Sequence, residues 1–165
     1  MPKGVRVLQR NLVNVLLSMR DAPGIKADDV LCAVTTLSFD IAALELFLPL
    51  LAGARVLIAT DEQRRDPDAL IALMRERGAT VLQTTPSWLR VLAGGGRARN
   101  LPRLKLLIGG EELPRDLAET VLPHCAELWN LYGPTETTIW STAARVASGE
   151  GAVPTGTSWR CASRM

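Results

Sequence analysis

The stretch NLYGPTETTIW, residues 130–140, gathers groups that can bind phosphate and a metal ion. Gly133 allows a ligand to approach the backbone closely. The threonines at 135, 137 and 138 supply hydroxyls that suit phosphate oxygens, and Glu136 supplies a lone carboxylate of the kind that Mg²⁺ binds while keeping most of its waters. Tyr132 could stack on a planar base. From these residue types alone, an ordinary turn with a threonine cap is an equally good interpretation.

Two other stretches contain candidate binding residues. In GGEEL, residues 109–113, the glycine pair permits close backbone approach, although such pairs also simply make turns. In SFDIAALELF, residues 38–47, Asp40 stands between apolar residues where a helix is expected to begin. Its carboxylate could cap that helix, which the residues alone favour, or it could face a pocket and hold a cation such as an amino group.

The order of the elements predicts how these stretches are placed. Short, nearly continuous apolar runs alternate with segments of helical period, and such runs are typical of strands covered on both faces. This alternation predicts an α/β fold with a doubly wound, mostly parallel sheet flanked by helices. Ligands of such sheets bind beyond the carboxyl ends of the strands, where all three stretches would lie. The expected strands are 30–34, 54–60, 79–85, 105–110 and 127–133, and the expected helices are 41–53, 66–78, 86–95 and 114–125.

Local signals set some of the element boundaries. Asp66 suits an N-cap, Pro67 the first helical position and Gly78 the position after the helix. Thr85 before a proline repeats the same pattern, and Pro49 should kink or end its helix. An amphipathic helix is expected over 5–20, and AGGGRARN, residues 93–100, is expected to be a flexible basic loop.

Composition indicates one globular domain with a sizeable core. The chain has 165 residues, 47% of them hydrophobic, and a formal net charge of only +2, which argues against a nucleic-acid partner. The sequence contains no apolar run of transmembrane length and no signal-peptide pattern, which argues against a membrane. Cys32, Cys125 and Cys161 form no CxxC motif and are expected to be reduced thiols, so we predict a cytoplasmic protein.

Four motifs in order give a resemblance to a known family. With PKGV at 2–5, LSFDIA at 37–42, GGEEL and NLYGPTETT, the chain resembles the adenylation (AMP-binding) domains of non-ribosomal peptide synthetases. The resemblance implies an internal fragment of the large N-terminal domain of the acyl-adenylate-forming fold. It covers residues 1–156, and residues 157–165 are expected to be an unrelated, disordered tail.

The resemblance also implies an activity, its cofactors and its partners. The parent enzyme would activate an amino acid with ATP and Mg²⁺ to an aminoacyl adenylate, for transfer to the phosphopantetheine thiol of a carrier protein. Carrier and condensation domains of the parent synthetase are the implied partners. Thr135 and Glu136 would act in catalysis, and Glu136 would hold the metal. The implied ATP-binding residues are Gly109, Gly110, Glu111, Asn130, Tyr132, Gly133 and Thr135.

The same resemblance implies a substrate pocket whose composition resembles that of glycine-activating domains. Asp40 would bind the α-ammonium group, which favours its pocket role over the N-cap. Leu44, Leu131 and Trp140 would fill the space of a side chain, and alanine would be the nearest competitor because one methyl group gives only about 1–3 kcal/mol of discrimination. The implied pocket residues are Asp40, Ile41, Leu44, Gln83, Leu107, Gly109, Leu131, Ile139 and Trp140.

The sequence also departs from the family pattern. Most of the phosphate-binding loop that precedes PKG, and the C-terminal part with its catalytic lysine, are not in this sequence. We therefore expect the isolated chain to be inactive, because such cationic and backbone groups stabilise developing charge. Two alternatives stay open: a fragment of an acyl or aryl acid–CoA ligase, which would not need an acid at position 40, and a non-catalytic nucleotide-binding module.

Overall fold

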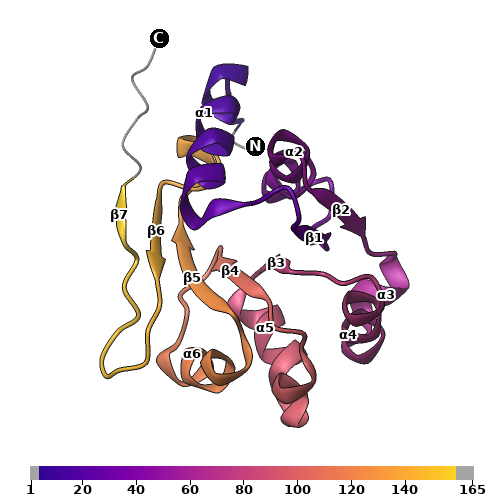
Figure 1. The fold of residues 1–165 in the computed structure, drawn as a ribbon. Helices are drawn as coiled ribbons and strands as arrows, with labels where there is room; N and C mark the ends of the chain where they lie inside the picture. The colour runs from indigo at the N-terminus through magenta and orange to yellow at the C-terminus, as the bar shows by residue number, and fades with distance from the viewer. Residues whose placement is uncertain (1–3, 159–165) are drawn as a thin grey trace.

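The described part of the chain is built around one seven-stranded sheet. The computed structural model describes residues 4–158, and the strand order is β2-β1-β3-β4-β5-β6-β7. The first five strands run parallel, whereas β6 pairs antiparallel with β5 and β7 pairs antiparallel with β6 (Figure 1). The predicted, mostly parallel sheet is confirmed. The strands are β1 (Val30–Ala33), β2 (Arg55–Ile58), β3 (Val81–Thr84), β4 (Lys105–Gly109), β5 (Glu127–Tyr132), β6 (Thr142–Arg145) and β7 (Thr157–Ser158).

Helices cover both faces of this sheet. In Figure 1, α1 and α2 lie on one side, and α4, α5 and α6 lie on the other. The α-helices are α1 (Gln9–Met19), α2 (Ile41–Ala52), α3 (Asp61–Arg65), α4 (Pro67–Glu76), α5 (Pro86–Ala93) and α6 (Arg115–Val121). A π-helical turn η1 (Arg20–Gly24) and three 3₁₀ segments, η2 (Gly94–Asn100), η3 (Leu122–His124) and η4 (Thr135–Thr137), complete the helical elements.

The layered arrangement produces two buried cores, one on each face. Successive residues of a strand alternate between them: Leu106 packs in the core under α4, α5 and α6, and Leu107 packs in the core under α1 and α2. The same alternation holds for Val81 and Leu82 of β3. This explains why the central strands are apolar at nearly every position, as expected for strands covered on both sides.

The predicted caps of two helices are confirmed. The Asp66 carboxylate accepts hydrogen bonds from the backbone N–H groups of Asp68 (2.9 Å) and Ala69 (3.2 Å), at the start of α4. The Thr85 hydroxyl accepts from the backbone N–H of Trp88 (3.3 Å) at the start of α5. Each cap satisfies N–H groups that have no partner inside the helix.

Three local predictions differ from the structure in part. Of the two effects expected of Pro49, a kink or an end of the helix, the end does not occur: α2 continues to Ala52 and stops at Gly53 with a left-handed φ of 73°. A proline in the last turn removes little of the helix, since few N–H bonds remain to be made beyond it. Residues 94–100, within the predicted flexible basic loop, form 3₁₀ turns (η2) that are interrupted at Gly95 and Gly96, whose φ values are 61° and 79°. The N-terminal helix begins at Gln9 rather than at residue 5.

The predicted tail falls partly within the described residues. Thr157 and Ser158 form β7 and pair with Ala143 and Thr142 of β6. The rest of the predicted tail lies outside the described residues.

Candidate functional site

One candidate site is a cleft at the carboxyl ends of β4 and β5. It has a volume of about 760 Å³. Five of the predicted ATP-binding residues line it, from the loop after β4 and from β5 with the turn that follows it. A third segment, residues 152–155, closes the far side. The lining residues are Gly110, Glu111, Glu112, Leu113, Asn130, Leu131, Tyr132, Gly133, Pro134, Ala152, Val153, Pro154 and Thr155.

Asn130 and Tyr132 lie two residues apart on β5, and both line the cleft. Their side chains offer different chemistry to it. Asn130 is buried, and its amide Nδ2 donates to the backbone carbonyl of Pro154 (3.0 Å). The amide nitrogen is therefore engaged, and the oxygen is the atom that the side chain can offer to a donor. Tyr132 is 58% exposed, so its ring is accessible from the cleft. A stacking surface and an amide acceptor together are suited to a heterocyclic base.

The loop after β4 is held by its own acidic residue. The Glu111 carboxylate accepts hydrogen bonds from both the backbone N–H (3.1 Å) and the hydroxyl of Ser87, at the N-terminus of α5. Gly110 adopts a left-handed φ of 87°, a conformation that glycine adopts without strain. These two features give the loop a defined shape beside the cleft.

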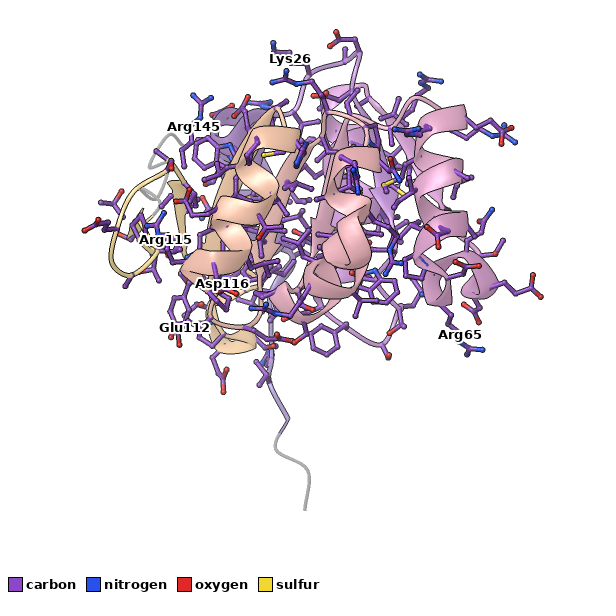
Figure 2. The ribbon with its side chains drawn as sticks, turned by 90° about the horizontal axis from the view of Figure 1, so that it is seen from below. Lys26, Arg65, Glu112, Arg115, Asp116 and Arg145 are labelled. Atoms are coloured by element: carbon purple, nitrogen blue, oxygen red, sulfur yellow. The ribbon has the colours of Figure 1, made fainter. Side chains whose placement is uncertain are left out.

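The far side of the cleft is fixed by a clamp from α6. The guanidinium of Arg115 donates to the backbone carbonyls of Ala147 (2.9 Å), Gly151 (3.1 Å) and Ala152 (3.3 Å). Figure 2 shows Arg115 between α6 and the loop that joins β6 to β7. Residues 152–155 of the same loop line the cleft. Arg115 thus positions one wall of the cleft without lining it.

The turn after β5 contains the predicted catalytic residues. Thr135 and Glu136 lie in the exposed segment η4, directly after Pro134 at the rim of the cleft. Gly133 is explained by packing: a Cβ there would lie 2.5 Å from the Cα of Trp140 and 2.6 Å from the carbonyl oxygen of Ile139. The close approach made by Gly133 in this structure is therefore to its own chain.

Two β-branched residues in this turn have unusual backbone conformations. Thr138 and Ile139 have φ values of 70° and 65°, in the left-handed region that such residues rarely adopt. The turn reverses the chain so that the backbone N–H of Ser141 donates to the carbonyl of Tyr132 (2.8 Å). Ile139 and Trp140 are thereby buried against the sheet.

The structure brings the predicted apolar pocket residues into one cluster. Six of them belong to the buried core between the sheet and helices α1 and α2, although they come from α2, β4, β5 and the turn after β5. These six are Ile41, Leu44, Leu107, Leu131, Ile139 and Trp140.

Gly109 and Gln83, the two other uncharged residues of the predicted pocket, both contact Trp140. A Cβ on Gly109 would lie 2.5 Å from the indole Cη2. The indole Nε1 donates to Gln83 Oε1 (3.0 Å). Trp140 is only 2% exposed. The indole thus occupies the space above Gly109, and nothing larger than glycine fits beneath it.

Asp40 lies at the N-terminus of α2 and is half-buried. Its side chain makes no capping hydrogen bond, so the N-cap interpretation is wrong. The next residue, Ile41, belongs to the Trp140 cluster and also lines a cavity of about 260 Å³ with Gln83. Asp40 thus directly precedes, in the chain, a residue of the cluster that contains other predicted pocket residues.

Glu45 is a buried polar residue that the sequence analysis did not identify. It is 0% exposed, in the middle of α2, directly after Leu44. Burial raises the pKa of its carboxyl above the ordinary value of 4.5, and the hydrogen bonds that it accepts from Thr35, Gln83 and Val34 oppose this shift. The available signal was that Glu45 is the sole charged residue in the apolar segment IAALELFLPLLA.

Two other kinds of feature are absent from the described residues. Between residues 4 and 158, no group of three or more His, Cys, Asp or Glu side chains is arranged to hold a metal ion. In the same range, no helix has both the length and the apolar character that crossing a bilayer requires.

The family model for AMP-binding enzymes matches residues 1–163, including the segments that form the cleft and the Trp140 cluster. The chain belongs to the AMP-binding enzyme family. This match extends past residue 156, where the sequence analysis expected the similarity to end.

Relatives within this family are non-ribosomal peptide synthetases. A dimodular nonribosomal peptide synthase of Bacillus subtilis (strain 168) is 46% identical over 154 residues, which are 93% of this chain and 6% of that protein. A four-domain nonribosomal peptide synthetase solved with AMP and glycine has a TM-score of 0.83 and 40% identity, over 89% of this chain and 11% of that one.

A further solved relative is an adenylation domain. AlmE of Vibrio cholerae, in complex with glycyl-adenosine-5'-phosphate, has a TM-score of 0.86 and 28% identity over 97% of this chain and 31% of that one. The AMP-binding chain therefore spans a small part of the relatives that it matches. Its fold corresponds to part of the acyl-adenylate-forming fold, as predicted.

Proposed function

We propose that this chain is part of an adenylation domain that activates an amino acid, with a preference for glycine. The carboxylate oxygen of the amino acid would attack the α-phosphorus of ATP, the bond from that phosphorus to the bridging oxygen would break, and pyrophosphate would leave. Catalysis of this kind depends mainly on positioning and charge neutralisation. The single observation that carries the glycine preference is the indole of Trp140 packed against Gly109. There the indole would take up the space of a substrate side chain.

The 760 Å³ cleft is the proposed site for ATP. The ring of Tyr132 would stack on adenine, and the Asn130 Oδ1 would accept from the exocyclic amine, since its Nδ2 is already bonded to Pro154. Gly109, Gly110 and Glu111 would border the base, with Gly133 at the turn. Thr135 would contact the α-phosphate from the rim.

Glu136 would hold the Mg²⁺ that accompanies ATP. One exposed carboxylate beside a triphosphate site fits this ion, because Mg²⁺ binds few protein ligands and keeps several waters. When bound, the ion would neutralise charge that develops on the phosphate oxygens.

The amino acid would bind between Asp40 and the Trp140 cluster. The half-buried carboxylate of Asp40 has no capping role and would hold the α-ammonium group. Leu44, Leu131 and Trp140 would exclude larger side chains by overlap, which is how a site can reject a substrate that is too large. Solved relatives with glycine or glycyl-adenosine-5'-phosphate support this choice.

The aminoacyl group would next pass to a carrier-protein thiol, and a condensation domain would use it for peptide synthesis. The relationship to multidomain synthetases supports these partners. We also infer a cytoplasmic location, because the reaction consumes ATP and the two cysteines among the described residues, Cys32 and Cys125, are free thiols.

Amino-acid-dependent exchange between ATP and pyrophosphate tests this function in a complete adenylation domain that contains these residues. Glycine should support exchange, alanine should support it weakly, and a fatty acid should not. Asp40→Ala should abolish exchange with glycine. Exchange that depends on a fatty acid and survives Asp40→Ala would instead favour an acid–CoA ligase.

We propose further that the 165-residue chain by itself does not catalyse this exchange. Calorimetry of the chain with MgATP addresses the remaining alternative. Tight, Mg²⁺-dependent binding without turnover, in a complete domain as well as in the chain, would favour a non-catalytic nucleotide-binding module.

A further inference from the structure

A buried line of hydrogen bonds crosses the apolar cluster that surrounds Trp140. The indole Nε1 of Trp140 donates to Gln83 Oε1 (3.0 Å), and Gln83 Nε2 donates to Glu45 Oε1 (3.4 Å). These three side chains are 2%, 1% and 0% exposed, respectively. The line therefore runs where water does not compete with its members.

The line ends in the loop that leads to Asp40. Glu45 Oε2 accepts from the backbone N–H groups of Val34 (2.9 Å) and Thr35 (2.9 Å), and Oε1 accepts from the Thr35 hydroxyl (2.6 Å). One carboxylate thus connects two walls of the proposed amino-acid pocket: the turn after β1 and, through Gln83, the indole of Trp140.

The chemistry of the groups allows a single direction along this line. An indole N–H can only donate, so Gln83 must present its oxygen to Trp140. The amide nitrogen of Gln83 then points to position 45 and needs an acceptor there. A carboxylate is an acceptor at both oxygens, whereas an amide or an apolar group at position 45 would leave buried donors without partners, which is costly.

We propose that Glu45 is a specificity-determining positioning residue, which holds the Trp140 indole over Gly109 by fixing the orientation of the Gln83 amide. This inference rests on the proposed function for its effect on substrate choice. Glu45 does not contact the substrate in this scheme. It acts through Gln83, and its loss would let the indole leave the space that excludes a larger amino acid.

The position of the indole can be tested without any enzymatic activity. We would label the tryptophan indoles of the full 165-residue chain with ¹⁵N, identify the Trp140 signal with Trp140→Phe, and measure hydrogen exchange of the indole N–H. In the unchanged chain this N–H should be protected. Glu45→Gln should speed its exchange at least tenfold, because the new amide donates to Gln83 and turns the amide of Gln83 against the indole.

The chain offers a matched control outside this line of hydrogen bonds. Glu127 also accepts a hydrogen bond from an indole, since Trp129 Nε1 donates to Glu127 Oε2 (2.8 Å). Trp129 is not among the residues of the proposed pocket. Glu127→Gln should therefore alter the Trp129 signal and leave exchange at Trp140 unchanged.

A second variant separates this role from a general loss of folding. Combining Glu45→Gln with Gln83→Glu moves the carboxylate one step along the line. The indole again faces an acceptor, the introduced amide oxygen still accepts from the backbone N–H groups of Val34 and Thr35, and the Thr35 hydroxyl must turn to accept from the amide nitrogen. The pair should restore the protection of Trp140 that Glu45→Gln removes. Unchanged protection in Glu45→Gln would overturn the proposal, as would a folded double variant that fails to restore it.

The consequence for substrate choice is measured in a complete adenylation domain that contains these residues. Glu45→Gln should lower the ratio of glycine- to alanine-dependent pyrophosphate exchange about tenfold, within the range that one methyl group controls. An unchanged ratio, despite a mobile indole, would overturn the role in specificity. Absence of exchange with any amino acid in the unchanged domain would refute the proposed function and leave the indole measurement to decide the role of Glu45 in positioning.

Discussion

Trp140 packs against two glycines, at positions where the chain has no side chain. Gly109 lies under its six-membered ring, and Gly133 lies against its backbone. These residues are far apart in the sequence, and only the pairing of β4 with β5 and the turn after β5 bring them together. A glycine can be required because a neighbouring side chain leaves no room for a Cβ, or because the backbone has a left-handed φ. The two cases differ in why a substitution by alanine is unfavourable.

Gly109→Ala should destabilise the folded chain by about 1–3 kcal/mol, because the new methyl group would overlap the indole in a packed core. Urea unfolding followed by tryptophan fluorescence measures this change. Gly149→Ala is the matched control, since no atom lies within 4 Å of a Cβ there and its φ is not left-handed. Equal stabilities for the two variants would contradict the packing that we describe.

The raised pKa of Glu45 predicts how stability depends on pH. Because burial raises its folded pKa above 4.5, the folded chain binds this proton more tightly than the unfolded chain does. The free energy of unfolding should therefore fall as pH rises from 4.5 through the folded pKa. Glu45→Gln should remove this contribution from the pH profile.

Two surface carboxyls act in a different range of pH. Hydrogen bonds from Arg90 lower the pKa of Asp116, and those from Ser148 and Gly149 lower the pKa of Glu119. Their contribution to the free energy of unfolding is lost as pH falls through these lowered pKa values. This happens at lower pH than the change expected from Glu45. Urea unfolding of the unchanged chain and of the Glu45→Gln chain between pH 4 and 8 tests the contribution of Glu45. If the free energy of unfolding changes with pH by the same amount in both, Glu45 makes no such contribution.

At the scale of elements, hydrophobic periodicity and helix-capping residues were sufficient to predict most of the secondary structure. The apolar runs located all five parallel strands, and Asp66 with Pro67 located the start of α4. The antiparallel strands β6 and β7 were missed because TAAR and TS are short and lack an apolar pattern. Glu45 was missed because a single acid in a helix usually faces solvent, and only the packing of α2 on the sheet buries it.

The Arg115 clamp is a property of α6 and the 147–152 loop together. Arg115→Leu removes the donors to three backbone carbonyls and should speed amide hydrogen exchange in residues 147–152, measured by mass spectrometry. Arg90→Leu is the matched control, because Arg90 pairs only with the exposed Asp116 among the contacts described for it. If both variants leave this loop equally protected, Arg115 does not hold the cleft wall.

At the scale of the molecule, the two cores share the same strands and should open together. Cys32 lies in β1, between β2 and β3, in the core under α4, α5 and α6, and the next core residues of β1 face the other side. Reaching its thiol requires neighbouring strands to separate. Burial, and secondarily the nearby charge of Glu45, raises the pKa of Cys32 to about 12, so the reactive thiolate is scarce at neutral pH.

We therefore expect alkylation of Cys32 to report on unfolding of the whole chain. In a Cys161→Ser variant treated with iodoacetamide at pH 8, Cys32 should stay unmodified while the chain is folded. Its rate should rise with urea in step with the unfolding transition seen by fluorescence. Cys125, after α6 and outside the strands, serves as the internal comparison and should react sooner. Rapid labelling of Cys32 without urea would mean that β1 opens independently and that the two cores are not one cooperative unit.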